Sequence, residues 1–518
     1  MAKIVIDPIT RIEGHLKVVV TVENGEVKEA HSSGTLFRGF ELILQGRDPR
    51  DATILTQRIC GVCPIAHAQA SALCLDDTFA VSDRVPKNGR IIRNLILGSN
   101  YIQSHILHFY HLAALDYVDV TAAADYEGND ADLKSVSAFL GRGALGPFVP
   151  RYEGDYRLPK EVNVAAVKHY VKALEMRRKA QEMLALFGGK MPHQCAIVAG
   201  GVTEKPTVDK IAAFLWRLNE IRDFVDHVYI PDVLAVAKGY SDHCAMGGGC
   251  GRFLSYGVFD LEDGNPDQTK RKRFIRQGLT DTSLKVEELD VSKITEDVKH
   301  SWFEGEDRLH PAFGETHPNL RKEEGYSFLK SPRYAGEVIE VGPLARMLVS
   351  YASGDEVIKG LVDGALSELG ADTSALFSIM GRHAARALEC KRIADAMVDW
   401  VLELDPTEPV CARYEIPEEA EGFGITDAPR GAVGHWMKVE DAKIAHYQCI
   451  VPTTWNASPR DAKGQPGPIE QALTGLPVKD EANPFEVVRT VRAFDPCLAC
   501  AVHVMKPSGA KVGAFRVV

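Results

Sequence analysis

Two Cys-x-x-Cys pairs lie near opposite ends of this sequence. Cys60 and Cys63 form the first pair, and Cys497 and Cys500 form the second, more than four hundred residues later. Thiolates are soft ligands for zinc, nickel, copper(I) or iron, and a spacer of two residues lets both sulfurs of a pair reach one ion or cluster. We therefore expect a fold that brings the two ends of the chain together around one metal site.

The composition is that of a large globular protein. Of 518 residues, 45% are hydrophobic and 25% are charged, which is enough for a large core. The formal net charge of -11 argues against a nucleic-acid surface, because phosphate binding relies on clustered lysine and arginine. The N-terminus lacks the pattern of a secretory signal, and no run of about eighteen apolar residues predicts a membrane span. Small molecules and protein partners are the expected ligands.

Hydrophobic periodicity predicts a mainly α-helical protein with smaller β parts, an α+β fold. The alternation of residues 17–22 before Asn24-Gly25 predicts a hairpin in an N-terminal sheet. Residues 250–335 and 405–490 are rich in Gly, Pro and polar side chains, so we expect irregular and β segments there, packed around a central helix bundle. Apolar residues spaced by three and four predict long helices over residues 91–112, 164–187, 207–228, 355–369 and 373–404.

The other cysteines do not form a recognisable ligand set. Eleven cysteines scattered over a long chain fit thiols and metal ligands better than a disulfide framework. Cys244 and Cys250 lie near His243, but their spacing fits no ligand pattern. We expect small buried side chains at Cys74, Cys195, Cys244, Cys250, Cys390, Cys411 and Cys449.

Spacing alone leaves three uses for the two pairs: structural zinc, an iron–sulfur cluster or a catalytic metal. A zinc ribbon usually closes its pairs within about twenty residues, because it organises a small module that lacks a core. This chain has a large core already, so the residues that flank the two pairs must distinguish among the three uses.

Those flanking residues resemble the two signature motifs of the large subunit of nickel–iron hydrogenases. The motifs are Arg58-Ile-Cys-Gly-Val-Cys-Pro-Ile-Ala-His67 and Asp495-Pro-Cys-Leu-Ala-Cys-Ala-Val-His503. The resemblance implies an oxidoreductase that acts on hydrogen and converts it reversibly to two protons and two electrons. Further similar segments span the whole chain, at residues 7–15, 38–41, 188–193, 340–346 and 428–431.

The resemblance implies nickel held by four thiolates. Cys60 and Cys497 would be terminal ligands, and Cys63 and Cys500 would bridge to an iron that carries carbon monoxide and two cyanides. Dihydrogen would be cleaved heterolytically, with the sulfur of Cys497 as the proton acceptor. Glu13 would then be the first proton relay.

The residue types alone leave ordinary alternatives for the outer positions. Glu13 could equally be a surface carboxylate or a partner of Arg11, and Arg430 an ordinary solvated arginine. By resemblance, Arg430 lies over the metals, after Pro429, and donates hydrogen bonds to a cyanide while Asp495 holds its guanidinium.

Four further positions are assigned by the resemblance. Pro452 and Thr453 resemble the segment that borders the other cyanide. His67 supports the metal-bound sulfurs without being a ligand, and a core histidine is the alternative. Glu41, His503 and the carbonyl of Cys449 resemble a separate site for magnesium or iron, which would tie down the C-terminus.

The sequence departs from the family at one place. Ser104-His105 stands where many relatives have Asp-His, which removes a carboxylate near Arg430. Residues 101–110 look most similar to the selenium-containing branch of the family, which carries selenocysteine at the place of Cys497. With Cys497, this chain is expected to be a sulfur enzyme close to that branch.

The resemblance also implies processing and partners. Residues 1–503 would form one large catalytic domain, and a maturation endopeptidase would remove residues 504–518 after nickel insertion. No further cysteine set suits an iron–sulfur cluster, so a small subunit with such clusters would carry the electrons away. Export together with that subunit favours a periplasmic location, with the cytoplasm as the alternative.

Two rival functions remain at this point. The quinone-reductase subunit of respiratory complexes shares the fold but has lost the cysteines, and all four are present here. A structural zinc protein would hold zinc alone, with no proton-relay carboxylate and no small subunit.

Overall fold

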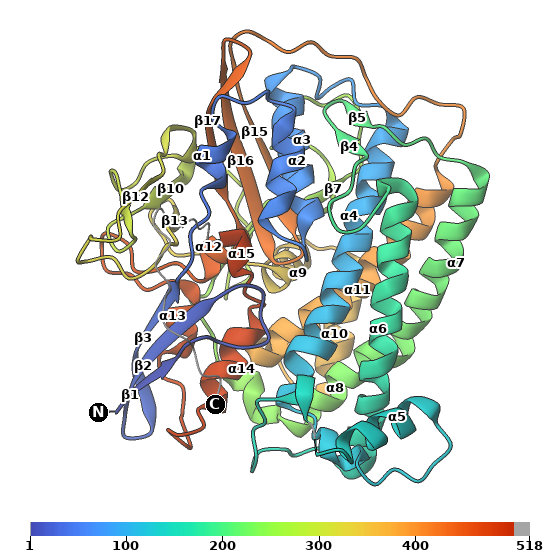
Figure 1. Ribbon diagram of the computed structural model, residues 1–518, viewed down its shortest axis with the longest axis vertical. Coiled ribbons are helices and arrows are strands. Elements are labelled where there is room, and N and C mark those ends of the chain that lie inside the picture. The colour runs from blue at the N-terminus through green and yellow to red at the C-terminus, as the bar shows by residue number, and fades with distance from the viewer. Residues whose placement is uncertain (1, 144, 502–518) are drawn as a thin grey trace.

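Long helices and small sheets occupy different sides of the molecule. The computed structural model describes residues 2–143 and 145–501, and the side chains of residues 500 and 501 lie outside that description. In Figure 1 the longest helices run side by side on the right, and the two largest antiparallel sheets, β1-β2-β3 (within residues 2–34) and β15-β16-β17 (within residues 420–450), lie to their left. The predicted α+β class with a helix bundle is confirmed.

Four long helices form the centre of the bundle. Helix α4 packs against α6 and α11, and α7 packs against the same two helices. Their apolar residues meet in one continuous core, because spacings of three and four put those residues on one helix face. The four helices are α4 (Lys87–Leu107), α6 (Lys160–Gly188), α7 (Val208–Phe224) and α11 (Ile379–Leu402).

Helix ends differ from the predicted ranges where side chains or π-helical segments intervene. A π-helical segment at His108–Ala113 follows α4, and another at Val225–Tyr229 joins α7 to α8 (Ile230–Gly239). The helix predicted from residue 373 is interrupted, because the hydroxyl of Ser378 accepts a hydrogen bond of 3.0 Å from the N–H of Gly381 and caps α11 there. The helix predicted over residues 355–369 is confirmed as α10 (Glu356–Leu369).

The N-terminal sheet has the order β1-β2-β3 and is antiparallel throughout. Its strands are β1 (Ala2–Ile6), β2 (Leu16–Glu23) and β3 (Glu26–Gly34). Glu23 pairs with Glu26 across Asn24-Gly25, so the predicted hairpin is confirmed. Alternate residues of β2 are buried, which fixes the sheet on the core.

A second antiparallel sheet, β15-β16-β17, packs against α3 (Pro64–Thr78). Its strands are β15 (Ala420–Ala428), β16 (Gly431–Glu440) and β17 (Lys443–Ile450). The approach is close at Gly424, where an added Cβ would lie 2.1 Å from the carbonyl oxygen of Ala70. Ala428 pairs with Gly431, so Pro429 and Arg430 form the tip of the β15–β16 hairpin.

Residues 250–335 contain short strands, as predicted, and the loops after residue 405 also carry short helices that periodicity did not indicate. Two of these short helices, α12 (Pro452–Asn456) and α13 (Pro468–Leu473), begin at proline, which favours the first helical turn. Among the described residues no helix is long and apolar enough to cross a bilayer. The remaining helices are α1 (Phe40–Leu44), α2 (Asp51–Thr56), α5 (Ala131–Leu140), α9 (Pro343–Ala352), α14 (Phe485–Ala493) and α15 (Leu498–Ala501). The remaining strands are β4 (Ile197–Val198), β5 (Gly201–Val202), β6 (Arg252–Ser255), β7 (Val258–Asp260), β8 (Arg273–Ile275), β9 (Gly278–Asp281), β10 (Ile294–Asp297), β11 (Phe303–Glu304), β12 (His317–Pro318), β13 (Ser331–Tyr334) and β14 (Glu340–Val341).

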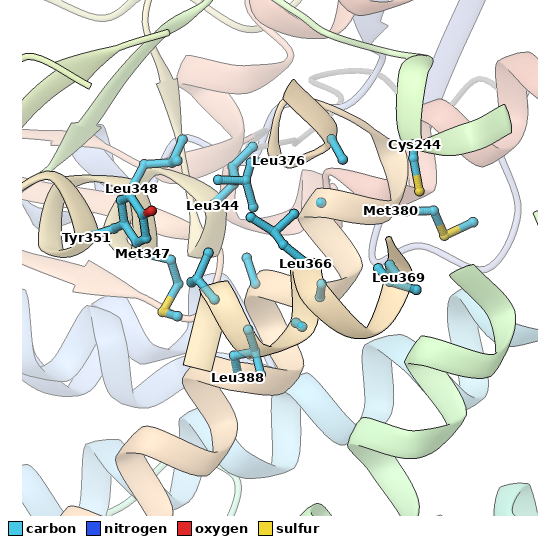
Figure 2. Close-up of a pocket in the computed structure, with 16 residues that line it drawn as sticks. Cys244, Leu344, Met347, Leu348, Tyr351, Leu366, Leu369, Leu376, Met380 and Leu388 are labelled. Carbon is cyan, nitrogen blue, oxygen red and sulfur yellow. The ribbon is translucent and has the colours of Figure 1, made fainter. Parts of the chain in front are cut away.

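A small apolar cavity lies where α9, α10 and α11 meet (Figure 2). Its volume is about 40 Å³, and Leu344, Met347 and Leu348 of α9 line one side. Cys244 lines it from the adjoining turn, as a small apolar side chain would. The same apolar side chains of α9 are buried in one cluster with residues of α10 and α11, which anchors α9 through its apolar face.

The expectation that the other cysteines are buried holds for some and is wrong for two. Cys74 and Cys390 are buried, and burial raises the pKa of the Cys250 thiol to about 12. Cys195 and Cys411 are exposed, because both lie in surface segments next to the short β4–β5 hairpin. The apolar character of cysteine therefore did not predict its burial where the surrounding segment lies at the surface.

Candidate metal centre

Three thiol side chains from opposite ends of the chain meet in the core. The sulfur of Cys497 lies 3.4 Å from that of Cys60 and 4.0 Å from that of Cys63, and the three sulfurs all lie within 4.8 Å of one another. All three residues are buried. The distance from Cys60 to Cys497 is well beyond the roughly 2.05 Å of a disulfide bond. The predicted convergence is confirmed for these three, and the side chain of Cys500 lies outside the described residues.

Local backbone geometry positions the first pair. Cys63 is the residue before α3, and Pro64 begins that helix. The sulfur of Cys60 accepts backbone hydrogen bonds from Val62, at 3.2 Å, and from Cys63, at 3.5 Å. Amide donors directed at a sulfur favour its thiolate form, which is the metal-binding form.

The second pair is held by the N-terminal segment and by α12. The backbone N–H of Cys497 donates to the hydroxyl of Thr453 at 2.9 Å. The N–H of Leu498 donates to the carbonyl oxygen of Glu13 at 2.7 Å. Gly14 has a φ of +80°, and an added Cβ there would lie 2.5 Å from the backbone nitrogen of Ala499, so glycine is required at this crossing.

Arg38 links the two cysteine loops directly. Its guanidinium donates to the carbonyl oxygen of Ile59, beside Cys60, and to that of Ala499, beside Cys497. Sequence reasoning included this arginine in a family segment but assigned it no role. The feature of the sequence that could have indicated this role is the position of Arg38 before Gly39, in a segment that resembles the family.

The donor set fits a soft metal. Three buried sulfurs packed at 3.4–4.8 Å leave thiolate charges facing one another, which a bound cation would neutralise. Nickel, iron and zinc all satisfy this test. The outer residues and the relatives therefore have to distinguish among them.

Glu13 contacts the sulfur of Cys497. Its Oε2 accepts from that thiol at 3.3 Å and from the backbone N–H of Ala499 at 3.0 Å. Burial raises the pKa of Glu13 above its ordinary value, and the nearby thiolate of Cys60 adds to this effect. Arg11 pairs with Asp116 instead, so the alternative that Glu13 serves as its partner is wrong.

Arg430 projects from the hairpin tip into the same region. Its Nε donates to the carbonyl oxygen of Asp495 at 3.1 Å, Nη2 lies 3.0 Å from the carboxylate of Asp495, and Nη1 donates to Ser104 at 3.3 Å. Burial alone would lower the pKa of Arg430, but Asp495 and the thiolates of Cys497, Cys63 and Cys60 raise it, so the guanidinium is charged. The alternative of a solvated arginine is wrong, because the residue is buried.

The remaining residues assigned by resemblance lie around this cluster. Pro429 shares the hairpin tip with Arg430, and Pro452 begins α12, next to Thr453. His67 lies in α3, where its Nδ1 is 3.4 Å from Nε2 of His435, and burial lowers its pKa to about 4. The partner His435 was not identified from the sequence, because nothing in the local pattern links β16 to α3.

Glu41 forms a second buried polar site. Its Oε1 accepts from the backbone N–H of Cys449 at 3.0 Å, and its Oε2 accepts from the hydroxyl of Thr316. Gln448 donates to that hydroxyl at 3.0 Å. His503, the other predicted side-chain ligand here, lies outside the described residues.

Comparison with known proteins identifies the family. The family described as nickel-dependent hydrogenase matches residues 38–503. The chain belongs to this family. A second family description, HoxL-like, matches residues 3–33.

Individual relatives match along nearly the whole chain. The periplasmic [NiFeSe] hydrogenase large subunit of Desulfomicrobium baculatum is 44% identical, covering 97% of this chain and 95% of that protein. The uptake hydrogenase large subunit of Bradyrhizobium diazoefficiens is 39% identical, covering 99% and 97%. Among solved structures, a variant of the [NiFeSe] hydrogenase of Desulfovibrio vulgaris Hildenborough has a TM-score of 0.86 and 46% identity, covering 97% of this chain and 99% of that chain.

Membership makes this chain a hydrogenase large subunit, an oxidoreductase that acts on hydrogen, and implies an active site of nickel and iron. The converging cysteines are the soft donor set that such a site requires. Neither a structural zinc protein nor a quinone-reductase subunit is favoured.

Replacing a central thiolate tests the donor set. We expect Cys63→Ala to remove nickel and abolish hydrogen oxidation, because loss of an outer partner alone already costs about 10–100-fold in metal affinity. The measurement is nickel per chain by mass spectrometry of the purified protein. Cys195→Ala, at an exposed cysteine, is the matched control and should retain nickel. Full nickel content in Cys63→Ala would contradict the assignment.

Proposed function

We propose that this chain binds nickel through Cys60, Cys63, Cys497 and Cys500, with Cys63 and Cys500 shared with an iron that carries carbon monoxide and two cyanides. The observation that carries the proposal is the buried triangle of thiol sulfurs formed by Cys60, Cys63 and Cys497. When bound, the metal pair supplies the centre at which dihydrogen is split and its two electrons are taken up.

The protein residues provide a proton acceptor and an exit. The sulfur of Cys497 is the base that takes one proton from dihydrogen, and Glu13 takes it next, because its Oε2 lies 3.3 Å from that sulfur. Glu13 also contacts the backbone beside the sulfur, which fixes the distance over which the proton moves. A relay needs this fixed geometry, since transfer requires hydrogen-bond contact.

Arg430 borders the proposed metal site from the tip of the β15–β16 hairpin. Its guanidinium is charged and buried, and it is held by Asp495 and Ser104. Nη2 of Arg430 and both carboxylate oxygens of Asp495 are buried and lack a hydrogen bond of good geometry among the described residues. Such atoms require polar partners, and cyanide nitrogens directed at Nη2 would provide one. Pro429, Pro452 and Thr453 would form the apolar and hydroxyl-bearing walls around the diatomic ligands.

Replacing Glu13 tests the relay. We expect Glu13→Gln to keep its nickel while the exchange of dihydrogen with solvent deuterons falls by about 10²–10⁴-fold, because the amide cannot accept the proton. Isotope exchange followed by mass spectrometry measures this directly. Glu26→Gln changes a glutamate outside this site, in β3, and should leave exchange unchanged. Undiminished exchange in Glu13→Gln would exclude the relay, and loss of nickel would assign Glu13 a structural role instead.

A small subunit with iron–sulfur clusters would remove the electrons. Among the described residues, Cys60, Cys63 and Cys497 are the one cysteine group placed to bind metal, so further clusters must come from elsewhere. The relatives are named large subunits, which supports such a partner. Export with that subunit to the periplasm is supported by the relative named periplasmic.

An exposed apolar patch beside the metal centre is the proposed docking face. Leu36, Leu42, Ile43 and Ile54 are 41%, 39%, 39% and 57% exposed, respectively. Leu42 and Ile43 lie in α1, which packs against α2, where Ile54 lies. Arg38, which contacts both cysteine loops, is separated from the start of α1 by one residue. Exposed apolar side chains gathered in one place mark a protein interface, and a short path to the metals suits electron transfer.

Charge inserted into this patch tests the docking face. We expect Ile43→Asp and Ile54→Asp to prevent isolation of the heterodimer by size-exclusion chromatography, because a desolvated carboxylate would be unpaired at the interface. Leu402→Asp is the control, since Leu402 is 61% exposed at the end of α11. Normal heterodimer from both patch variants would exclude this face.

Two further assignments complete the proposal. Glu41, the carbonyl of Cys449 and His503 would bind magnesium or iron, and the buried carboxylate of Glu41 supports this hard-ligand site. A maturation endopeptidase would cut after His503, leaving residues 1–503 as one catalytic domain and releasing residues 504–518. Both assignments follow the family resemblance, and both involve His503, which lies outside the described residues.

A further inference from the structure

The tip of the β15–β16 hairpin is held by a buried arginine that the proposed mechanism does not use. Arg346 lies in the first turns of α9, is wholly buried, and donates to the carbonyl oxygens of Ala428 at 2.8 Å and Pro429 at 2.9 Å. These two carbonyls immediately precede Arg430. Figure 1 shows α9 at the end of this hairpin.

All five N–H groups of Arg346 have acceptors. Besides the two carbonyls, Nε and Nη2 donate to the carboxylate of Glu389 at 2.6 and 2.7 Å, and Nη1 lies 3.4 Å from Asp427. An arginine has five such donors in a planar fork, so the position of the guanidinium is fully determined by its partners. The hairpin tip is therefore tied to a rigid group rather than to solvent.

The support extends into two bundle helices. Glu389 of α11 also contacts Nε2 of His105, in α4, at 2.8 Å. Tyr101, one turn earlier in α4, donates to the carbonyl oxygen of Asp427 at 2.7 Å, and Arg346 lies over its ring. The clamp, defined as Arg346, Glu389 and His105, thus connects the long helices α4 and α11 to the hairpin tip.

The apolar face of α9 keeps this clamp in place. Leu344, Met347 and Leu348 line the cavity in Figure 2, and Arg346 lies on the side of the helix toward the hairpin. Gly342, just before α9, has a φ of +134°, and an added Cβ would lie 3.1 Å from the carbonyl oxygen of Arg430. The start of α9 and the hairpin tip are therefore packed backbone against backbone.

The guanidinium of Arg430 has contacts of its own, and its Nε donates to the carbonyl oxygen of Asp495 at 3.1 Å. Its Nη1 donates one hydrogen bond of 3.3 Å to the hydroxyl of Ser104. The carboxylate of Asp495 lies 3.0 Å from Nη2, but both of its oxygens lack a hydrogen bond of good geometry among the described residues. These contacts hold the guanidinium at the far end of the side chain, and the backbone at the hairpin tip sets the point from which that side chain projects.

We propose that Arg346 is a positioning residue for the hydrogenase reaction, which sets the place of Arg430 over the metal centre by clamping the carbonyls of Ala428 and Pro429. Glu389 and His105 orient Arg346 for this task. The inference rests on the proposed function of Arg430 at that centre. The alternative is an ordinary buried ion pair that stabilises the core and has no specific influence on the site.

The test uses Arg346→Lys and Glu389→Gln in the complete enzyme. Lysine keeps the charge but has no planar fork, so it cannot hold both carbonyls and Glu389 together. Arg333→Lys is the matched control. Arg333 is also buried and pairs with Asp461 at 2.9 Å. Its backbone acceptors, however, are the carbonyl oxygens of Pro332 and Gln465, not those of the hairpin tip.

We expect both clamp variants to retain nickel, to lose about 100-fold in turnover, and to shift the infrared cyanide bands with little movement of the carbonyl band. A displacement of about 1 Å at a catalytic group has a cost of this size. The Arg333→Lys control should show wild-type bands. Combining Arg346→Lys with Arg430→Lys should add little to the effect of Arg430→Lys alone, because the two residues act through one group.

Hydrogen exchange gives a readout that does not depend on the diatomic ligands. Backbone amides of residues 425–434 should exchange faster in Arg346→Lys than in the wild type, and not in Arg333→Lys. Wild-type cyanide bands with wild-type turnover in Arg346→Lys would overturn the proposal, as would additive effects with Arg430→Lys. Nickel loss in both clamp variants but not in the control would also overturn it, by making the clamp a folding element.

The two proposals fail in different ways. A wild-type enzyme without carbonyl and cyanide bands would overturn the proposed diatomic ligands, and turnover and amide exchange would still decide the clamp. Carbonyl and cyanide bands in the wild type, with the same bands and wild-type turnover in both clamp variants, would overturn the clamp alone.

Discussion

The crossing of the N-terminal segment with the Cys497 loop is the constraint on which the site depends. Leu498 donates to the carbonyl of Glu13, and Gly14 leaves room for the backbone of Ala499. The same crossing puts the carboxylate of Glu13 against the sulfur of Cys497. One local arrangement therefore both closes the metal-binding pocket and supplies its first proton acceptor.

Arginines hold the loops around this crossing. Arg38 links the carbonyls beside the two cysteine loops, Arg346 holds the hairpin tip, and Arg492 donates to the carbonyl of Thr10 at 2.9 Å. Loops cannot satisfy their own buried carbonyls, and an arginine can serve several acceptors at once. Charge is balanced nearby, as at Arg346 with Glu389, so the centre is rigid without being apolar.

The features of the fold and site that depend on local motifs and residue spacing were predicted from the sequence. Soft-ligand spacing predicted that Cys60 and Cys497 meet, Asn24-Gly25 predicted a hairpin, and apolar spacing predicted the long helices. The sequence also indicated Glu13 and Arg430, through resemblance to a family. These features are encoded within a few residues of one another or within a recognisable motif.

What sequence reasoning missed depends on contacts between distant segments. Gly424 lies inside strand β15, where glycine is unfavourable, yet it allows β15 to pack closely on α3. A Cβ at this position would lie 2.1 Å from the carbonyl oxygen of Ala70. The cap at Ser378 interrupts a helix that apolar spacing extends without a break. The pairing of His67 with His435 and of His105 with Glu389 joins residues hundreds of positions apart, which no local pattern reveals.

The most direct test of the account is the infrared spectrum of the purified enzyme in the region where metal-bound carbon monoxide and cyanide absorb, with nickel and iron measured on the same sample. We expect one carbonyl band and two cyanide bands with stoichiometric nickel and iron. A blank spectrum with both metals present would contradict the diatomic ligands, and a blank spectrum with zinc alone would contradict the nickel–iron centre itself.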